Sequence, residues 1–287
     1  MTALNLRVHV KQHPHVGRMR KRQRVLQLKN LQHKRATELW YKTELLKVVK
    51  VITTRTEEIL KPLLQKLSYQ WSKDSVAHDG YKVDLEQTFD DLASSFGGLR
   101  QTAQRLAKLA AERCAERVDE SLKEALKRSV GVDITGALTS EALAAPMESA
   151  LVANVELIKS IPTKYLDSVK SRVYESTSEG LRWEDIVEKI QDIGSVTESR
   201  AKLIARDQVS KMNGSFNKAR QVSLGIDKYI WQTSGDERVR DTHADNNGKV
   251  FNWDDPPATG HPSEDIACRC DAIPYFNLDE EEQNLGI

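Results

Sequence analysis

Apolar side chains recur every three or four positions over most of the chain's first half, which is typical of amphipathic helices. Between residues 18 and 71 this spacing predicts one very long helix, or two helices broken near Pro62. After a polar turn, a second apolar stripe over residues 85–126 predicts another long helix. Because a short link joins the two stripes, we expect an antiparallel helical hairpin over residues 18–130.

The middle of the chain is also predicted to be helical, after a looser connector at residues 131–150. Helical spacing covers residues 152–178, and Gly180 stands where a glycine commonly ends a helix. A short amphipathic helix over residues 183–193 and a further helix capped by Thr197 are expected to follow.

The pattern changes near residue 225, where short β-type segments replace the helical spacing. Residues 229–233 and 249–253 are predicted strands joined through the Asn247-Gly248 turn, and residues 273–276 form a last short strand. The predicted fold class is therefore α+β. It comprises a long N-terminal helical hairpin, a helical middle and a small mixed C-terminal module with a short antiparallel sheet.

The net charge of +1 hides a strong polarity along the chain. Residues 1–73 hold 17 Lys and Arg against 4 Asp and Glu, whereas the remainder holds 26 against 38. We expect residues 1–17 to form a flexible basic arm and residues 277–287 an acidic tail. A basic arm on an acidic body favours a polyanionic partner, and a solvated helix that simply lacks acids is the alternative. The candidate contacts are Arg18, Arg20, Lys21, Arg22, Arg24, Lys29, Lys34 and Arg35.

Composition excludes several classes of protein. With 39% hydrophobic and 30% charged residues, the chain is neither collagen-like, low-complexity nor a disulfide scaffold. No apolar run approaches the roughly 18 residues of a membrane span, so we expect no membrane segment. Three cysteines in the whole chain suit a reducing cytoplasm.

Two histidines and two cysteines near the C-terminus form the most informative constellation: His243, His261, Cys268 and Cys270. Imidazole nitrogen and thiolate sulfur are the ligands of tetrahedral zinc, which makes zinc the candidate cofactor. The Cys-x-Cys spacing differs from the usual Cys-x2-Cys, and so short a loop disfavours a disulfide. Alternatively, the cysteines are small buried hydrophobes and the histidines are hydrogen-bonded loop residues.

Other polar residues of this region allow two interpretations. The charged run over residues 236–241, next to His243, suits water activation or phosphate binding, but we favour an exposed loop held by ion pairs and capping. Arg206 either bridges to the C-terminal module or is a salt-bridged surface residue, and we favour the latter. Trp231 and Trp253 are predicted core anchors of the sheet.

The order W-x-T-x-x-D-x-R-x-R-x-x-H from Trp231 to His243, followed by Gly, Pro and Cys-Arg-Cys, is a specific pattern. It resembles the phage Mu F-type minor head protein, or head morphogenesis, family, and we expect residues 151–276 to form that domain. The chain departs from the family where it has Asp207-Gln208 instead of Thr-Glu and Ser263 instead of glycine. The motif residues other than the zinc candidates are Trp231, Asp236, Arg238, Arg240, Gly248, Pro262 and Arg269.

The resemblance implies a minor capsid protein of a tailed bacteriophage that supports head assembly and DNA packaging or ejection. Such a protein is made in the bacterial host cytoplasm and lies in the virion, at the portal vertex or capsid interior. Portal protein, major capsid protein and packaged DNA are the implied partners. The alternative is a metal-dependent hydrolase or nuclease acting on DNA during assembly, with Asp241 and His243 activating water. We favour the non-enzymatic role.

Overall fold

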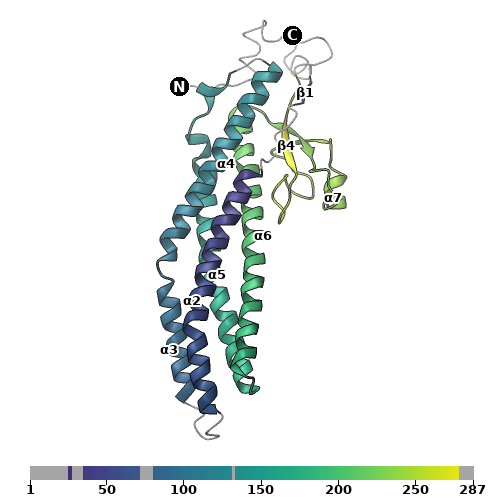
Figure 1. Cartoon of the computed structure of the whole chain (residues 1–287). Helices are drawn as coiled ribbons and strands as arrows, with labels where there is room; N and C mark the ends of the chain where they lie inside the picture. The colour runs from purple at the N-terminus through teal and green to yellow at the C-terminus, as the bar shows by residue number, and fades with distance from the viewer. Residues whose placement is uncertain (1–24, 28–34, 72–79, 131–132, 278–287) are drawn as a thin grey trace, which may run out of the picture. The chain divides into compact units, whose positions relative to one another are not determined.

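The computed structural model describes residues 25–27, 35–71, 80–130 and 133–277 (Figure 1). Most of them are helical, and three short strands near the C-terminus form an antiparallel sheet, which confirms the α+β class. The helices are α2 (Ala36–Trp71), α3 (Gly80–Ser95), α4 (Leu99–Val130), η1 (Thr135–Ala137), α5 (Glu141–Ser178), α6 (Trp183–Ser223) and α7 (Asp241–Ala244). The strands are β1 (Val25–Gln27), β2 (Lys228–Gln232), β3 (Val250–Asn252) and β4 (Asp271–Asn277).

The described residues divide into two compact units. The helical unit consists of Glu38–Lys108 and Val152–Ala205. The sheet unit combines the described parts of Met1–Thr37, Leu109–Leu151 and Arg206–Ile287. Among the described residues, no helix combines the length and the apolar character needed to cross a lipid bilayer.

Helix α2 organises the helical unit. Its buried side chains include Tyr41, Leu45, Ile52, Leu60, Leu64 and Leu67, which recur at helical spacing. The Tyr41 hydroxyl donates to Asn154 Oδ1 of α5 over 2.9 Å. Of the two alternatives left open at Pro62, the structure has the continuous helix: Pro62 lies on the exposed face, where water can reach the carbonyl that its missing N–H leaves unpaired.

Two predicted helix boundaries are wrong. The expected cap Thr197 lies inside the continuous helix α6, where its hydroxyl donates to the Ile193 carbonyl over 2.8 Å, as a mid-helix threonine does. Helix α5 begins at Glu141, so the second half of the predicted 131–150 connector is already helical. The predicted end at Gly180 is confirmed, since this glycine has a φ of +71°.

The sheet unit contains an antiparallel sheet with the strand order β1-β4-β2-β3. Strand β2 lies between β3 and β4, with Tyr229 opposite Phe251 and Ile230 opposite Ile273. The three C-terminal strands are therefore placed as predicted. The turn at Gly248, with a φ of +78°, is present, but it follows α7 and does not close a two-residue hairpin.

The prediction that a helix begins at residue 18 is wrong, because strand β1 lies within the predicted range. Residues Val25–Gln27 are extended and pair antiparallel with β4, Leu26 lying opposite Phe276. Strand β4 would otherwise present a row of unpaired backbone groups on that side, and a third extended segment satisfies them. Local helical spacing could not reveal this pairing, which joins segments about 250 residues apart.

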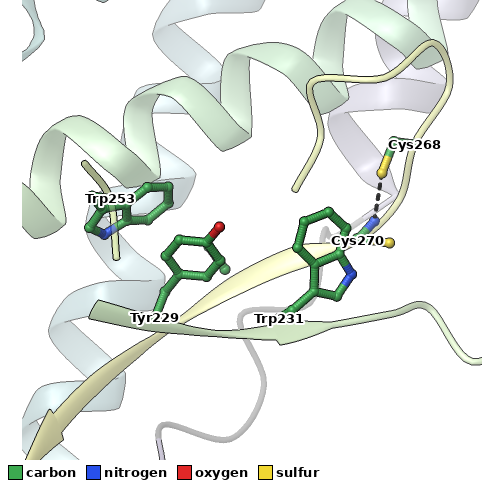
Figure 2. Packing of buried hydrophobic residues seen from close by; sticks show 6 residues of the cluster. Tyr229, Trp231, Trp253, Cys268 and Cys270 are labelled. Atoms are coloured by element: carbon green, nitrogen blue, oxygen red, sulfur yellow. Dashed lines mark hydrogen bonds between the residues drawn. The ribbon is translucent and has the colours of Figure 1, made fainter. Parts of the chain in front are cut away.

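The core of the sheet is built from aromatic rings and the two C-terminal cysteines (Figure 2). The Tyr229 and Trp253 rings lie 4.3 Å apart, and Trp231 is fully buried. The prediction that Trp231 and Trp253 anchor the sheet is therefore confirmed. The cluster consists of Tyr229, Trp231, Trp253, Cys268, Cys270 and Ala272.

Candidate metal centre

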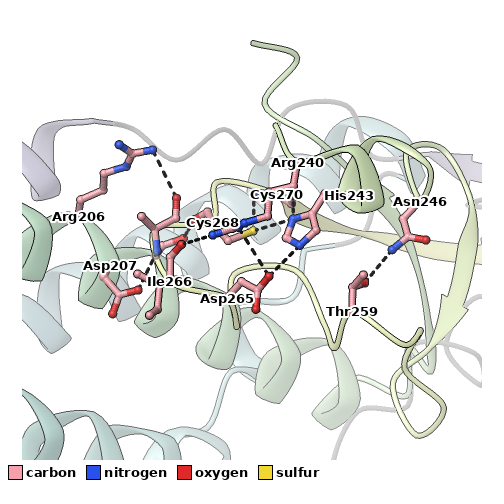
Figure 3. Close-up of polar contacts among 12 residues, drawn as sticks. Arg206, Asp207, Arg240, His243, Asn246, Thr259, Asp265, Ile266, Cys268 and Cys270 are labelled. Atoms are coloured by element: carbon pink, nitrogen blue, oxygen red, sulfur yellow. Dashed lines mark hydrogen bonds and ion pairs between the residues drawn. The ribbon is translucent and has the colours of Figure 1, made fainter. Parts of the chain in front are cut away.

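The C-terminal half of α6 holds the loop that carries the two cysteines. Asp207 Oδ1 accepts a hydrogen bond of 2.9 Å from the Ala267 backbone N–H, and the Ser210 hydroxyl donates to the Cys268 carbonyl. Arg206 Nη2 donates to the Ala267 carbonyl over 3.4 Å (Figure 3). Arg206 is therefore bonded to the C-terminal module, contrary to the favoured surface interpretation.

The same face of α6 continues to fix the chain about two and three turns further on. Asn217 and Gln221 both donate side-chain hydrogen bonds to the Ala272 carbonyl, over 2.8 and 3.0 Å. Between Ser210 and Asn217, Gly214 lets the loop approach the helix closely, because a Cβ there would lie 2.8 Å from Ser263 Cβ. Ser263 itself has a φ of +73°, a left-handed conformation that favours glycine. Glycine is the residue that the family resembled by the motif often has at this position.

Sequence reasoning missed this polar stripe. Its signal is present in the sequence as polar or small residues at alternating steps of three and four along one helix face: Asp207, Ser210, Gly214, Asn217 and Gln221. An apolar stripe is expected on a buried helix face, so polar residues at core spacing indicate a segment held through its backbone groups.

Three of the four predicted ligands meet at one point. His243 Nδ1 lies 3.5 Å from both Cys268 Sγ and Cys270 Sγ, and the three potential ligand atoms all lie within 4.8 Å of one another. The exposed fractions of the three residues are 2–3%, so their side chains are almost fully buried. We call His243, Cys268 and Cys270 the Cys-His cluster.

The orientation of His243 is fixed from the opposite side of its ring. Its Nε2 lies 3.0 Å from Asp265 Oδ2, and a carboxylate accepts, so Nε2 carries the proton and Nδ1 presents its lone pair to the sulfurs (Figure 3). Arg240 holds this loop by donating to the Ile266 carbonyl over 2.9 Å. The Trp231 ring packs edge-on against the imidazole, with 5.2 Å between centroids.

The two thiols differ in how readily they lose a proton. The thiol and the backbone N–H of Cys270 hydrogen-bond to the Cys268 sulfur and lower the pKa of Cys268, although burial acts against this. The same hydrogen bond, together with burial, raises the pKa of Cys270. Cys268 is therefore the thiol that becomes a thiolate first.

His261, the fourth predicted ligand, is not brought to the Cys-His cluster. Lys218 Nζ lies 3.1 Å from its Nε2, and the Tyr229 hydroxyl lies 2.8 Å from its Nδ1. An ammonium group can only donate, so Nε2 accepts and the proton lies on Nδ1. Burial, and then the positive charge of Lys218, lower the pKa of His261. Spacing in the sequence could not separate the two histidines, because both belong to one small module and neither spacing shows which ring faces the sulfurs.

The charged run over residues 236–241 forms internal contacts, which is the interpretation that the sequence favoured. Asp236 accepts from the Arg238 backbone N–H over 3.1 Å and forms an ion pair with Arg269. These contacts bring basic side chains around a small pocket beside the Cys-His cluster. The pocket is lined by Arg206, Arg238, Arg240 and Arg269, as well as by His243, Cys268 and Cys270.

Most of the predicted contacts of the basic arm lie outside the described residues: Arg18, Arg20, Lys21, Arg22, Arg24, Lys29 and Lys34. Arg35 is described; it is exposed and immediately precedes α2. Residues 1–17 and 278–287 also lie outside, while Asn277, expected in the acidic tail, is the last residue of β4.

Comparison with known proteins agrees with the resemblance read from the motif. Residues 167–273 match the family described as Phage Mu protein F like protein. An uncharacterized protein of Haemophilus influenzae is 33% identical over 264 residues, which cover 91% of this chain. The chain spans 57% of that relative's length. No solved structure matches the chain significantly.

Proposed function

We propose that this chain is a minor head protein of a tailed bacteriophage, because residues 167–273 match the Phage Mu protein F like family. The observation that carries the proposal is the family match, which spans the segment from the second half of α5 to β4 and includes the Cys-His cluster. The family match points to head morphogenesis. Its finer role is inferred here: support of head assembly and of DNA packaging or ejection, at the portal vertex or capsid interior.

The uneven distribution of charge along the chain supports different contacts for the N-terminal segment and for the sheet unit. The first 35 residues contain no Asp or Glu, and a cationic segment of this kind binds phosphates or an acidic protein surface. We assign it contact with the portal protein or packaged DNA. The sheet unit, with its aromatic core and its loops fixed to α6, is suited to rigid docking on portal or major capsid protein.

Deletion of the coding sequence from its phage tests the proposal, with complementation by the full chain as control. We expect fewer DNA-filled heads and a large loss of infectious particles, both restored by the full chain. A variant lacking residues 1–35 should restore heads less completely than the full chain, since it lacks the cationic contact. Normal numbers of filled, infectious heads in the deletion would refute a head role.

One observation favours the second candidate, a metal-dependent hydrolase. The Cys-His cluster offers three potential ligands and adjoins a pocket lined by arginines, an arrangement that suits a metal-bound water and a phosphate. However, the residues that line this pocket include no Asp or Glu to serve as a general base. Incubation of the protein with plasmid DNA and divalent metal distinguishes the hydrolase from the structural role. Plasmid cleavage that is lost in His243→Ala favours the hydrolase, and intact plasmid favours the structural role.

A further inference from the structure

The Cys-His cluster has the chemistry of a zinc site. We propose that His243, Cys268 and Cys270 hold one zinc ion, and that the fourth ligand is an exchangeable one from the arginine-lined pocket. This inference concerns the isolated chain and does not depend on the head role. It narrows the ligand set expected from the sequence, since His261 is bonded elsewhere.

The spacing of the three groups fits the ion. Zinc binds sulfur at about 2.3 Å and imidazole nitrogen at about 2.0 Å, so a tetrahedral ion places the two ligand atoms about 3.5 Å apart. His243 Nδ1 lies 3.5 Å from each sulfur. The backbone and loop contacts already described hold these atoms at that separation, so binding needs little rearrangement.

The imidazole is oriented as a ligand. Metal-binding histidines usually donate their second ring N–H to a carboxylate or a carbonyl, which fixes the tautomer and raises the basicity of the ligating nitrogen. Asp265 accepts from His243 Nε2 over 3.0 Å and leaves Nδ1 free for the ion. Asp265 is in turn held by Arg240, with 3.6 Å between Nη1 and Oδ2.

The surroundings of the two sulfurs suit thiolates, the form in which cysteine binds metals. The Cys270 backbone N–H donates to Cys268 Sγ over 3.4 Å. The Trp231 Nε1 is buried, and Figure 2 shows it on the side of the indole that faces Cys270. A negatively charged sulfur at Cys270 would be a strong acceptor for this N–H.

A three-ligand zinc ion keeps one position open. The same three residues that would hold the ion also line the pocket with four arginines, so this position faces a positively charged space. Water or a small anion such as phosphate, azide or a carboxylate would occupy it. A fourth protein ligand from His261 is excluded by the engagement of both its ring nitrogens.

Metal titration of the full chain tests the site. Protein purified under reducing conditions and stripped with chelator is titrated with cobalt(II), and zinc is then used to displace it. We expect about one ion per chain and a thiolate-to-cobalt charge-transfer band that zinc abolishes. A chain that remains folded by circular dichroism but binds neither metal would overturn the proposal.

Matched variants locate the ion. Cys268→Ser, Cys270→Ser and His243→Gln should each weaken cobalt binding at least about tenfold, whereas Cys114→Ser and His261→Gln should bind like the wild type. Because a ligand variant can fail to fold, zinc-dependent thermal stabilisation of the unmodified chain provides a second readout. Wild-type affinity in folded Cys268→Ser and Cys270→Ser would place the metal elsewhere and refute the assignment.

The open position has its own test. Adding azide or phosphate to the cobalt-loaded chain should shift the visible cobalt bands, because the ligand exchanges at the metal. Arg238→Ala should weaken the phosphate response while leaving cobalt stoichiometry unchanged, because the Arg238 side chain is exposed and lines the pocket. Bands that no anion alters would show a closed site and overturn this half of the proposal.

Discussion

Arg220 of α6 donates two hydrogen bonds to the carboxylate of Asp119 on α4, over 2.7 and 2.9 Å. A third hydrogen bond runs from Arg220 Nη1 to the Thr139 carbonyl. The Arg220 side chain is almost fully buried within the sheet unit. A paired, bidentate guanidinium of this kind fixes the C-terminal end of α6, the helix that also carries the residues holding the cysteine loop.

Replacing Arg220 should destabilise the sheet unit markedly. Arg220→Ala leaves Asp119 with an uncompensated charge in a half-buried position, and we expect a loss of about 3–5 kcal/mol in the free energy of unfolding. Urea denaturation measures it. Lys202→Ala, which breaks an exposed pair with Glu198, should cost less than about 1 kcal/mol. Equal, small effects of both variants would contradict a structural role for the buried pair.

Gly214 should tolerate no side chain. An added Cβ would lie 2.8 Å from Ser263 Cβ and 3.0 Å from the Pro262 carbonyl oxygen, so Gly214→Ala should cost about 1–3 kcal/mol through overpacking. Gly98→Ala is the control, because nothing lies within 4 Å of its Cβ position. Thermal unfolding compares the two. An unchanged melting temperature in Gly214→Ala would mean that the loop does not approach α6 this closely.

Stability should fall on mild acidification because of His261. Burial and Lys218 hold its pKa in the folded chain below its usual value near 6.5, so the unfolded chain takes up the proton first. The stabilising contribution is complete above about pH 6.5 and is lost as the pH falls through the folded pKa. Melting curves from pH 8 to about pH 5 follow it. His261→Gln should show a flatter profile over that range, and an identical slope would contradict the assignment.

The N-terminal segment should bind DNA through charge. If the acid-free first 35 residues contact phosphates, affinity falls steeply as salt rises, because binding releases counterions. Deleting residues 1–35 should abolish most of this binding, while deleting the acidic residues 278–287 should not. Fluorescence anisotropy with a labelled duplex measures the affinity of both deletion variants. Affinity that is independent of salt would argue for a protein partner instead.

The sequence predicts those parts of the fold that local patterns encode. The sheet strands follow from β-branched and aromatic residues such as Tyr229 and Ile273, and Gly180 marks a helix end through its positive φ. The clustering of Cys268 and Cys270 with a histidine also follows from residue type and proximity in sequence.

Local sequence patterns do not predict contacts between residues that lie far apart in the sequence. Strand β1 depends on an edge offered by residues about 250 positions away, and the choice between His243 and His261 depends on which ring faces the sulfurs. Thr197 can cap a new helix or lie within one, and its hydroxyl bonds the Ile193 carbonyl inside the continuous helix α6. For β1 and for the two histidines, the deciding contact lies outside the local window.

The central claim is that this chain is a component of phage heads, and the protein content of purified heads tests it most directly. Particles are banded, treated with nuclease and protease to remove adhering material, and analysed by quantitative mass spectrometry. The account predicts peptides from the sheet unit at a low, constant ratio to the major capsid protein, protected from protease in intact heads. Their absence from DNA-filled heads, while the protein is abundant in the lysate, would contradict it.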